Sequence, residues 1–356
     1  MEFPLCPECG VPQQFAAGHV WLNSGVIVEK DNRSLRVCYV EVANLNPLYD
    51  GIEEQLGVPI ERLIVDTQCK CTRDYLMPLV PNELREMLKK GEITLDPIID
   101  VLILLGIMNG VGRHEKITYR YERDDEDYFK SICRNVHCLP LELGDFAAAC
   151  EAVMEREFSN LDYKLLGEET YEITARPAEF PEEFIGRLEW KGYEHSDGDI
   201  EFEPCESCGA PKDLAFKWYP EEGIIINTRN GRRMSFLQPG AFDTILEEME
   251  KELGEVIRPV TVESQRRFTK RFHKVEEVAD KEAFRHQLAL RGLGDLQELD
   301  MSAKGLSMRI EHACMYLVMT GMMQGIFEMA FDVESNVEWD LSDTNILRVE
   351  VKPRKP

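Results

Sequence analysis

The pattern of hydrophobic and polar positions along the chain occurs twice. Each occurrence opens with a Cys-x-x-Cys-Gly segment, called a knuckle below, and then a tryptophan. A β-branched run follows, at 25–28 and 223–226, and each run leads to an Asn- or Gly-containing turn. Such runs bounded by turn residues predict β-hairpins. An amphipathic helix comes next, at 49–57 and 245–254, and each ends in Gly, which is typical of a helix C-terminus.

The two occurrences then continue in parallel. A strand-like run leads in both to a second predicted helix, in which residues 67–75 align without a gap to residues 264–272. A Gly-x-Gly turn, strands, a long helix around a Cys138–Cys314 match and a closing strand complete each occurrence. Around 81–96 the first occurrence carries extra residues, which predict an additional helix.

This order of elements predicts the fold class. Strands grouped around helices without a strict βαβ alternation favour an α+β fold. The repetition predicts an internal tandem duplication with pseudo-twofold symmetry, as in a homodimer fused into one chain. The predicted limits are copy one at 1–178 (knuckle and hairpin 1–80, C-terminal unit 96–178), a linker at 179–203, and copy two at 204–356 (knuckle and hairpin 204–275, C-terminal unit 281–356). Within the linker, residues 184–190 also predict a packed helix.

The two knuckles are the strongest chemical signal. They place Cys6 and Cys9 on one tight turn and Cys205 and Cys208 on another. Each turn supplies half of a tetrahedral Cys₄ site. A pseudo-twofold axis brings equivalent turns together, so the sequence predicts one structural zinc ion per chain, held by all four cysteines and joining the copies.

Other interpretations of these cysteines stay open. Cys69 and Cys71 offer a rival donor pair to the first knuckle, although copy two has Arg266 and Phe268 at the equivalent positions. The knuckles can also be reduced thiols or relics of a lost site. A redox role is not favoured, because a redox Cys-x-x-Cys normally opens a helix after a strand.

Polar and basic positions predict a site for a small molecule. The second predicted helix of each copy has a polar face, with Gln68 in copy one and Gln265 in copy two. It also has a basic face, with Arg73 and Arg267 respectively, which is suited to a carboxylate or phosphate. The alternative is a buried polar face and a solvated basic face. Copy two also carries a methionine stripe, which is typical of cores and of adaptable pockets. The predicted ligand-binding residues are Gln68, Arg73, Cys138, Gln265, Arg267, Cys314 and Met319.

Evidence for catalysis is weaker. Cys138 and Cys314 each have a histidine nearby in sequence, but adjacency in sequence does not place a base beside a nucleophile. Buried structural cysteines are the alternative. The chain contains no H-E-x-x-H, G-x-S-x-G or P-loop signature, so no catalytic residue is predicted.

The C-terminal part of each copy resembles the 4-vinyl reductase domain family. The resemblance lies in the Gly-x-Gly turn, strands, a cysteine, a long helix with small residues and a closing strand, clearest from Gly292 to Val351 and weaker from Gly110 to Ala175. It implies a small-molecule sensor or carrier of the α+β ligand-binding type. Some relatives carry metal-binding cysteines near the last strand, and these are absent here, so that metal site is not implied.

Composition narrows the classes of partner. Among 356 residues, 41 Lys and Arg stand against 66 Asp and Glu, a net charge of −25, which disfavours nucleic acid. The apolar stretches are too short for a membrane span, so no membrane partner is expected. Eleven cysteines, an odd number, favour a reducing, cytoplasmic location. The acidic surface is a candidate interface for a protein partner.

The sequence thus favours a zinc-stabilised protein that binds a small molecule or acts as a regulatory or accessory factor. The expected ligand is hydrophobic or aromatic and carries an anionic group. The alternatives are a reductase-type or cysteine-dependent enzyme of tetrapyrrole or aromatic metabolism, and an acidic scaffold protein. We expect no enzymatic activity from the leading hypothesis.

Overall fold

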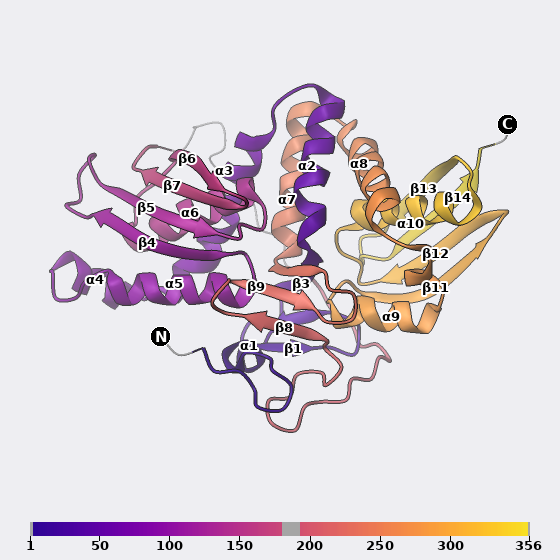
Figure 1. Ribbon diagram of the computed structural model, residues 1–356, viewed down its shortest axis with the longest axis horizontal. Coiled ribbons are helices and arrows are strands. Elements are labelled where there is room, and N and C mark those ends of the chain that lie inside the picture. Colours follow the sequence, from indigo (N-terminus) through magenta and orange to yellow (C-terminus); the bar gives the residue numbers. More distant parts are fainter. Residues whose placement is uncertain (1–2, 180–192, 355–356) are drawn as a thin grey trace. The chain divides into compact units, whose positions relative to one another are not determined.

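The computed structural model describes residues 3–179 and 193–354 and shows an α+β protein, as predicted (Figure 1). Two compact units are present, and each is assembled from segments distant in sequence. Unit 1 comprises Met1–Leu5, Pro59–Lys191 and Phe216–Ser235, and unit 2 comprises Cys6–Val58, Gly192–Ala215 and Phe236–Pro356. The predicted domain limits describe repeat copies rather than compact units, and they stay a prediction. Residues 184–190, predicted as a helix, lie outside the described residues.

Unit 1 is built around a four-stranded antiparallel sheet with the strand order β4-β5-β7-β6. Helices α3 and α6 pack against each other beside this sheet. Its elements are α3 (Glu61–Leu76), η1 (Met77–Leu79), α4 (Asn82–Lys89), α5 (Asp96–Asn109), β4 (Arg113–Arg120), β5 (Tyr128–Arg134), α6 (Leu139–Met154), β6 (Asn160–Gly167), β7 (Thr170–Arg176), β8 (Phe216–Tyr219), β9 (Ile224–Asn227) and most of β10 (Arg233–Leu237).

Unit 2 contains a second four-stranded antiparallel sheet, in the order β11-β12-β14-β13. Helices α8 and α10 form its closest helix pair, and α2 packs on α8. Its elements are α1 (Gln13–Gly18), β1 (His19–Trp21), β2 (Ile27–Glu29), β3 (Arg36–Glu41), α2 (Val42–Leu56), α7 (Pro239–Leu253), α8 (Ile257–Phe272), η3 (Val275–Val278), α9 (Lys281–Leu290), β11 (Asp295–Ser302), β12 (Gly305–Glu311), α10 (Tyr316–Phe331), β13 (Ser335–Leu341) and β14 (Leu347–Pro353).

In unit 1 the β8–β9 hairpin packs against the first Gly-x-Gly turn. A Cβ atom on Gly223 would lie 2.3 Å from the carbonyl oxygen of Gly112, so only glycine permits this approach. The indole Nε1 of Trp218 donates a hydrogen bond to the carbonyl of Met108 at 2.9 Å. Trp218, from the hairpin's first strand, and Gly223, from its turn, therefore serve one contact surface.

Unit 2 contains the same contact between different segments. A Cβ atom on Gly25 would lie 2.5 Å from the carbonyl oxygen of Gly294, and Trp21 Nε1 donates to the carbonyl of Leu290 at 3.0 Å. Each compact unit thus combines the hairpin of one predicted copy with the C-terminal part of the other. This correspondence agrees with a duplication, which itself stays a prediction.

The sequence predicts strands directly before the second helices, and this prediction is wrong because of close helix pairing. Those residues begin α3 and α8 instead. A Cβ atom on Gly144 of α6 would lie 2.8 Å from the carbonyl oxygen of Val65 in α3, and one on Gly321 of α10 would lie 2.4 Å from that of Val262 in α8. The apolar residues of the runs pack along these helix contacts, so tertiary packing overrides their β propensity.

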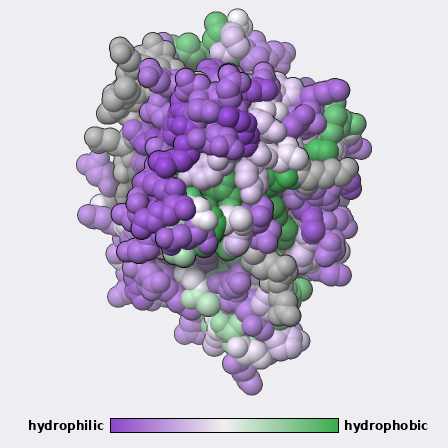
Figure 2. Space-filling model, turned by 90° about the vertical axis from the view of Figure 1, so that its left-hand side faces the viewer, coloured by the Kyte–Doolittle hydropathy of each residue, from purple (hydrophilic) through white to green (hydrophobic). Residues whose placement is uncertain are grey.

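Other predicted elements are confirmed. The amphipathic segments at 49–57 and 245–254 are the C-terminal parts of α2 and α7, and Gly57 ends α2 in the left-handed region with φ of +68°. The extra residues around 81–96 form α4. Among the described residues, no helix combines the length and apolar character that a membrane span requires. Hydrophilic residues dominate the face drawn in Figure 2, where hydrophobic residues occur in small, separate groups.

Candidate metal centre

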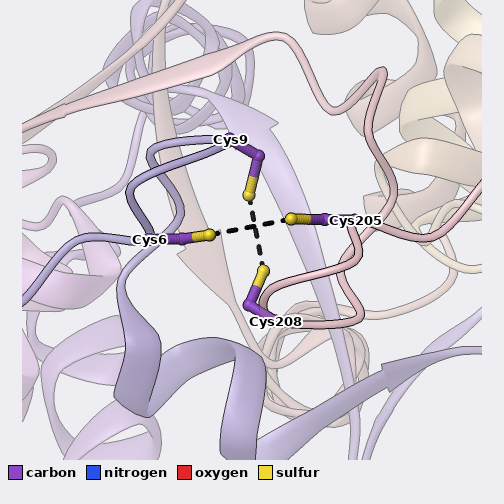
Figure 3. A group of neighbouring side chains, drawn as sticks. All are labelled: Cys6, Cys9, Cys205 and Cys208. Carbon is purple, nitrogen blue, oxygen red and sulfur yellow. Dashed lines mark hydrogen bonds between the residues drawn. The ribbon is translucent and has the colours of Figure 1, made fainter.

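The two knuckles, 199 residues apart, meet within unit 2. The Sγ atoms of Cys6 and Cys205 lie 3.6 Å apart, and those of Cys9 and Cys208 lie 3.4 Å apart. All four sulfur atoms lie within 4.8 Å of one another. Figure 3 shows the four side chains pointing toward a common centre from opposite sides. The structure therefore brings together the four cysteines that the sequence singled out.

Each knuckle reaches this geometry through the same local turn. The amide of Gly10 donates to the carbonyl of Cys6 at 2.9 Å, and the amide of Gly209 donates to the carbonyl of Cys205 at 2.8 Å. Both glycines adopt the left-handed region, with φ of +75° and +79°. A side chain at either position would strain the turn, so the Gly of the Cys-x-x-Cys-Gly pattern is a backbone requirement.

The environments of the four thiols differ. Backbone hydrogen bonds from Cys9 and Glu8 lower the pKa of the Cys6 thiol to about 6, despite its burial. Burial raises the pKa of Cys9 and of Cys208. Thiolates this close repel one another, and only a cation at their centre allows all four to ionise together.

A tetrahedral metal ion fits the spacing of the sulfur atoms. With Zn–S bonds of about 2.3 Å, tetrahedral ligands lie about 3.8 Å apart, close to the two sulfur–sulfur distances given above. In a disulfide the two sulfur atoms lie about 2.05 Å apart, so the sulfur atoms of each pair would have to approach by more than about 1 Å. The four cysteines form a group that can hold a metal ion, and the ion's identity belongs to the proposal below.

A polar contact connects the two knuckles beside the cysteines. Glu8 Oε2 accepts hydrogen bonds from the amide of Ser207 at 3.2 Å and from its hydroxyl at 3.0 Å. Hydrogen bonds from Cys205 and Ser207 hold the pKa of Glu8 below its usual value. Sequence reasoning missed this pair, although both residues occupy the variable positions of the knuckles. The contact joins the two turns directly, in addition to the cysteines.

The rival donor pair lies elsewhere. Cys69 and Cys71 belong to α3 of unit 1, whereas the four-cysteine group belongs to unit 2. Both are buried. They are therefore not members of the observed group.

The predicted ligand-binding residues of unit 1 contact neighbouring side chains. Gln68 Nε2 donates to Asp145 Oδ1 at 2.8 Å and to Thr72 Oγ1 at 3.1 Å. Arg73 Nη1 lies 3.2 Å from Glu151 Oε2, and the side chain of Glu151 is 1% exposed. The polar face is thus buried, and Arg73 already compensates an internal carboxylate.

The corresponding residues of unit 2 show the same arrangement. Gln265 Nε2 donates to Thr269 Oγ1 at 3.2 Å, and Arg267 Nε donates to Glu263 Oε1 at 2.7 Å. Lys270 Nζ lies 2.9 Å from the buried Glu328. Met319 is buried in α10. The assignment of these residues to a ligand site stays a prediction.

The two candidate nucleophiles lie near helix starts, at different positions. Cys138 directly precedes α6, whereas Met315 directly precedes α10 and Cys314 is one residue further back. The sequence match of Cys138 to Cys314 is therefore wrong by one position. Relative to the helix start, Cys314 corresponds to His137, and Cys138 corresponds to Met315. Both cysteines are buried.

A second group of potential metal ligands lies in unit 1 and escaped sequence reasoning. It consists of His114, Cys133 and Glu142, with donor atoms within 4.8 Å of one another. The three residues are spread over two strands and a helix, so no short motif joins them. Only the strand register and the helix start could have revealed the group.

Comparisons with known proteins add little. No protein-family model matches the chain, and no curated protein matches it. Among solved structures, a Cs H-NOX mutant carrying 4-cyano-L-phenylalanine covers 34% of this chain and 75% of its own, at 16% identity and a TM-score of 0.25. A point mutant of T. tengcongensis H-NOX covers 34% of this chain and 76% of its own, at 16% identity and a TM-score of 0.24. Overlap at this level supports no inference about function.

Proposed function

We propose that this protein is a zinc-stabilised small-molecule-binding protein with a regulatory or accessory role. The observation that carries the proposal is the convergence of four sulfur atoms from two knuckles 199 residues apart. Four thiolates complete a tetrahedral zinc site and leave no position for water. The zinc would therefore stabilise the fold and take no part in a reaction.

Zinc is preferred to iron on chemical grounds, although both accept four thiolates in tetrahedral geometry. A d¹⁰ ion without redox activity suits a site whose role is to join two segments of chain. Metal analysis distinguishes the two, because iron bound to four thiolates is coloured and zinc is not. We expect a colourless protein that contains zinc.

The matched variants for this test are Cys205→Ser and Cys150→Ser. Cys150 is a buried cysteine of the unit 1 core and lies outside the four-cysteine group. Under reducing conditions, protein purified without added metal should lose this zinc in Cys205→Ser and keep it in Cys150→Ser. Zinc bound equally by both variants would refute the Cys₄ assignment.

The small-molecule part of the proposal rests on the resemblance to 4-vinyl reductase domains and on the basic residues of α3 and α8. A hydrophobic or aromatic ligand with an anionic group would compete with the partly exposed Glu263 for Arg267. Titration with aromatic acids and porphyrin-like compounds, followed by tryptophan fluorescence, tests binding. Arg267→Ala should weaken it, whereas Lys304→Ala, on an exposed turn, should not. Absence of binding across both compound classes would refute this part.

The surroundings of Cys314 favour a cysteine-dependent enzyme as the second candidate. Although burial opposes it, hydrogen bonding with Cys38 and the charge of Arg36 and Arg291 lower the pKa of Cys314. Burial raises the pKa of Cys150, which gives an internal reference. Alkylation near neutral pH, mapped by peptide mass spectrometry, should modify Cys314 before Cys150 if Cys314 is a nucleophile. Equal, slow modification of both cysteines would exclude this candidate.

A further inference from the structure

We propose that unit 1 contains a second metal site of different chemistry, in which His114, Cys133 and Glu142 bind one divalent transition-metal ion. The site would leave one coordination position for a ligand from solution. The inference rests on the geometry of unit 1 and does not depend on the proposed function.

Strand register and the start of α6 bring the three side chains together. His114 on β4 is the direct cross-strand partner of Cys133 on β5. Glu142 lies in the first turn of α6, where the helix dipole favours a negative charge. His114 Nε2 lies 2.6 Å from Glu142 Oε1, and the three donor atoms lie within 4.8 Å of one another.

Neighbouring groups hold the His114 ring in the orientation that a metal ligand needs. The hydroxyl of Ser131 donates to the carbonyl of Glu115 at 3.3 Å. The Ser131 oxygen can then accept a hydrogen bond from His114 Nδ1, 2.9 Å away, and this bond directs Nε2 toward Glu142. The ring also stacks on Phe146, with ring centroids 5.4 Å apart. Metal-binding histidines are usually fixed by such a hydrogen bond on the second nitrogen. A metal ion would replace the proton between Nε2 and the carboxylate.

Unpartnered polar atoms point to a missing ligand. The side chain of Glu142 is 2% exposed, and its Oε2 atom has no hydrogen-bond partner, since His137 Nδ1 lies 3.7 Å away. His137, fully buried, places Nδ1 3.0 Å from the carbonyl of Val111 and leaves Nε2 without a partner. A buried carboxylate oxygen without a partner is costly, and a cation would remove that cost.

Unit 2 shows that the fold does not require these polar residues. At the equivalent register of its sheet, Leu296 pairs with Ile310, and both are fully buried. The fourth residue of α10, which corresponds to Glu142 in α6, is Met319. The same architecture is therefore stable with three apolar residues, so the polar trio of unit 1 needs a reason other than folding.

The donor set limits the ion and its ligand. One imidazole nitrogen, one thiolate and one carboxylate suit Zn²⁺, Co²⁺ or Fe²⁺, and three protein ligands leave a position open. Arg233 Nη1 donates to Glu169 Oε2 at 2.8 Å; burial lowers the pKa of its guanidinium, and interactions with Glu169, Cys133 and Glu142 oppose that shift. A positive charge beside the ion favours hydroxide or another small anion as the fourth ligand.

The test counts metal ions in the full chain. Protein stripped with a chelator under reducing conditions is reloaded with Co²⁺, and bound metal is measured by elemental analysis and by thiolate-to-cobalt absorbance. Wild type should bind two ions per chain. A His114→Leu/Cys133→Ile/Glu142→Met variant, which copies the residues of unit 2, should bind one. Cys205→Ser/Cys208→Ser should retain the ion of unit 1, which separates this result from failure of the Cys₄ site.

A single ion in wild type that the triple variant retains, or two ions in the triple variant, would overturn the proposal. If the triple variant does not fold, Ser131→Ala gives the second measurement. Removal of that hydrogen bond should weaken the second ion's binding by about 10- to 100-fold, and unchanged affinity would count against the site.

Discussion

Removing the Cys₄ metal should destabilise the protein through one long closed loop. An ion bound by the four cysteines would join Cys6 to Cys205 across 199 residues. The chain-entropy estimate for a cross-link that closes a loop of this length is about 5 kcal/mol at 25 °C. Most folded domains are stable by only about 5–15 kcal/mol, so loss of the ion should be easy to measure.

The assay is urea unfolding, with and without a chelator, on a parent protein and on its Cys205→Ser derivative. Both proteins carry His114→Leu/Cys133→Ile/Glu142→Met, so that only the Cys₄ ion responds to the chelator. The chelated parent protein and its untreated Cys205→Ser derivative should then show the same decrease in unfolding free energy, about 5 kcal/mol. Cys150→Ser serves as the control, because it removes a buried thiol outside the group and should still respond to the chelator.

Two results would refute this reasoning. If the chelator removes the ion and the unfolding free energy changes by less than about 1 kcal/mol, the ion does not cross-link the knuckles. If the protein instead contains disulfides between the knuckles, each lowers its mass by two hydrogens and only a reductant will destabilise it.

Three further predictions concern packing and charge. Gly321→Ala should destabilise the protein by about 1–3 kcal/mol, because its Cβ would meet the carbonyl of Val262, whereas Gly106→Ala, in a helix with only Val111 Cγ2 nearby, should be neutral or stabilising in thermal unfolding. Burial and Glu142 raise the pKa of Asp145 to about 7, so the free energy of unfolding of the metal-free protein should fall as pH rises from about 4 to 7. Asp145→Asn should remove that fall. A variant whose pH profile is identical to that of wild type would contradict the assignment. Burial alone would raise the pKa of Glu328, but Lys270, Ser335 and Arg266 lower it. The contribution of Glu328 to the free energy of unfolding should therefore be complete above about pH 4.3 and disappear at lower pH. Glu328→Gln should lower the free energy of unfolding by about 2 kcal/mol at pH 7, measured by urea unfolding, and should flatten this acid dependence.

The sequence was most informative where a local pattern had one structural meaning. The knuckles, the hairpins and the helix end at Gly57 were predictable because short-range turn chemistry determines them. The strand-like runs at the starts of α3 and α8 were misjudged, because packing against Gly144 and Gly321, far along the chain, decides their conformation. No local pattern reports a contact of that range.

The candidate sites divide in the same way. The Cys₄ group was predictable because two identical motifs implied one shared site. The trio of His114, Cys133 and Glu142 was not, since it depends on the register of β4 with β5 and on the first turn of α6. The internal pairing of Arg73 with Glu151 also lay beyond sequence reasoning, because a basic face looks the same whether its partner is solvent or a buried carboxylate.

X-ray absorption at the zinc edge tests the central claim most directly. The sample is the His114→Leu/Cys133→Ile/Glu142→Met variant loaded with one equivalent of zinc, so that a single site contributes. The account predicts four sulfur ligands at about 2.3 Å and no nitrogen or oxygen ligand. Fewer than four sulfur ligands, or any light-atom ligand in the first coordination sphere, would contradict it.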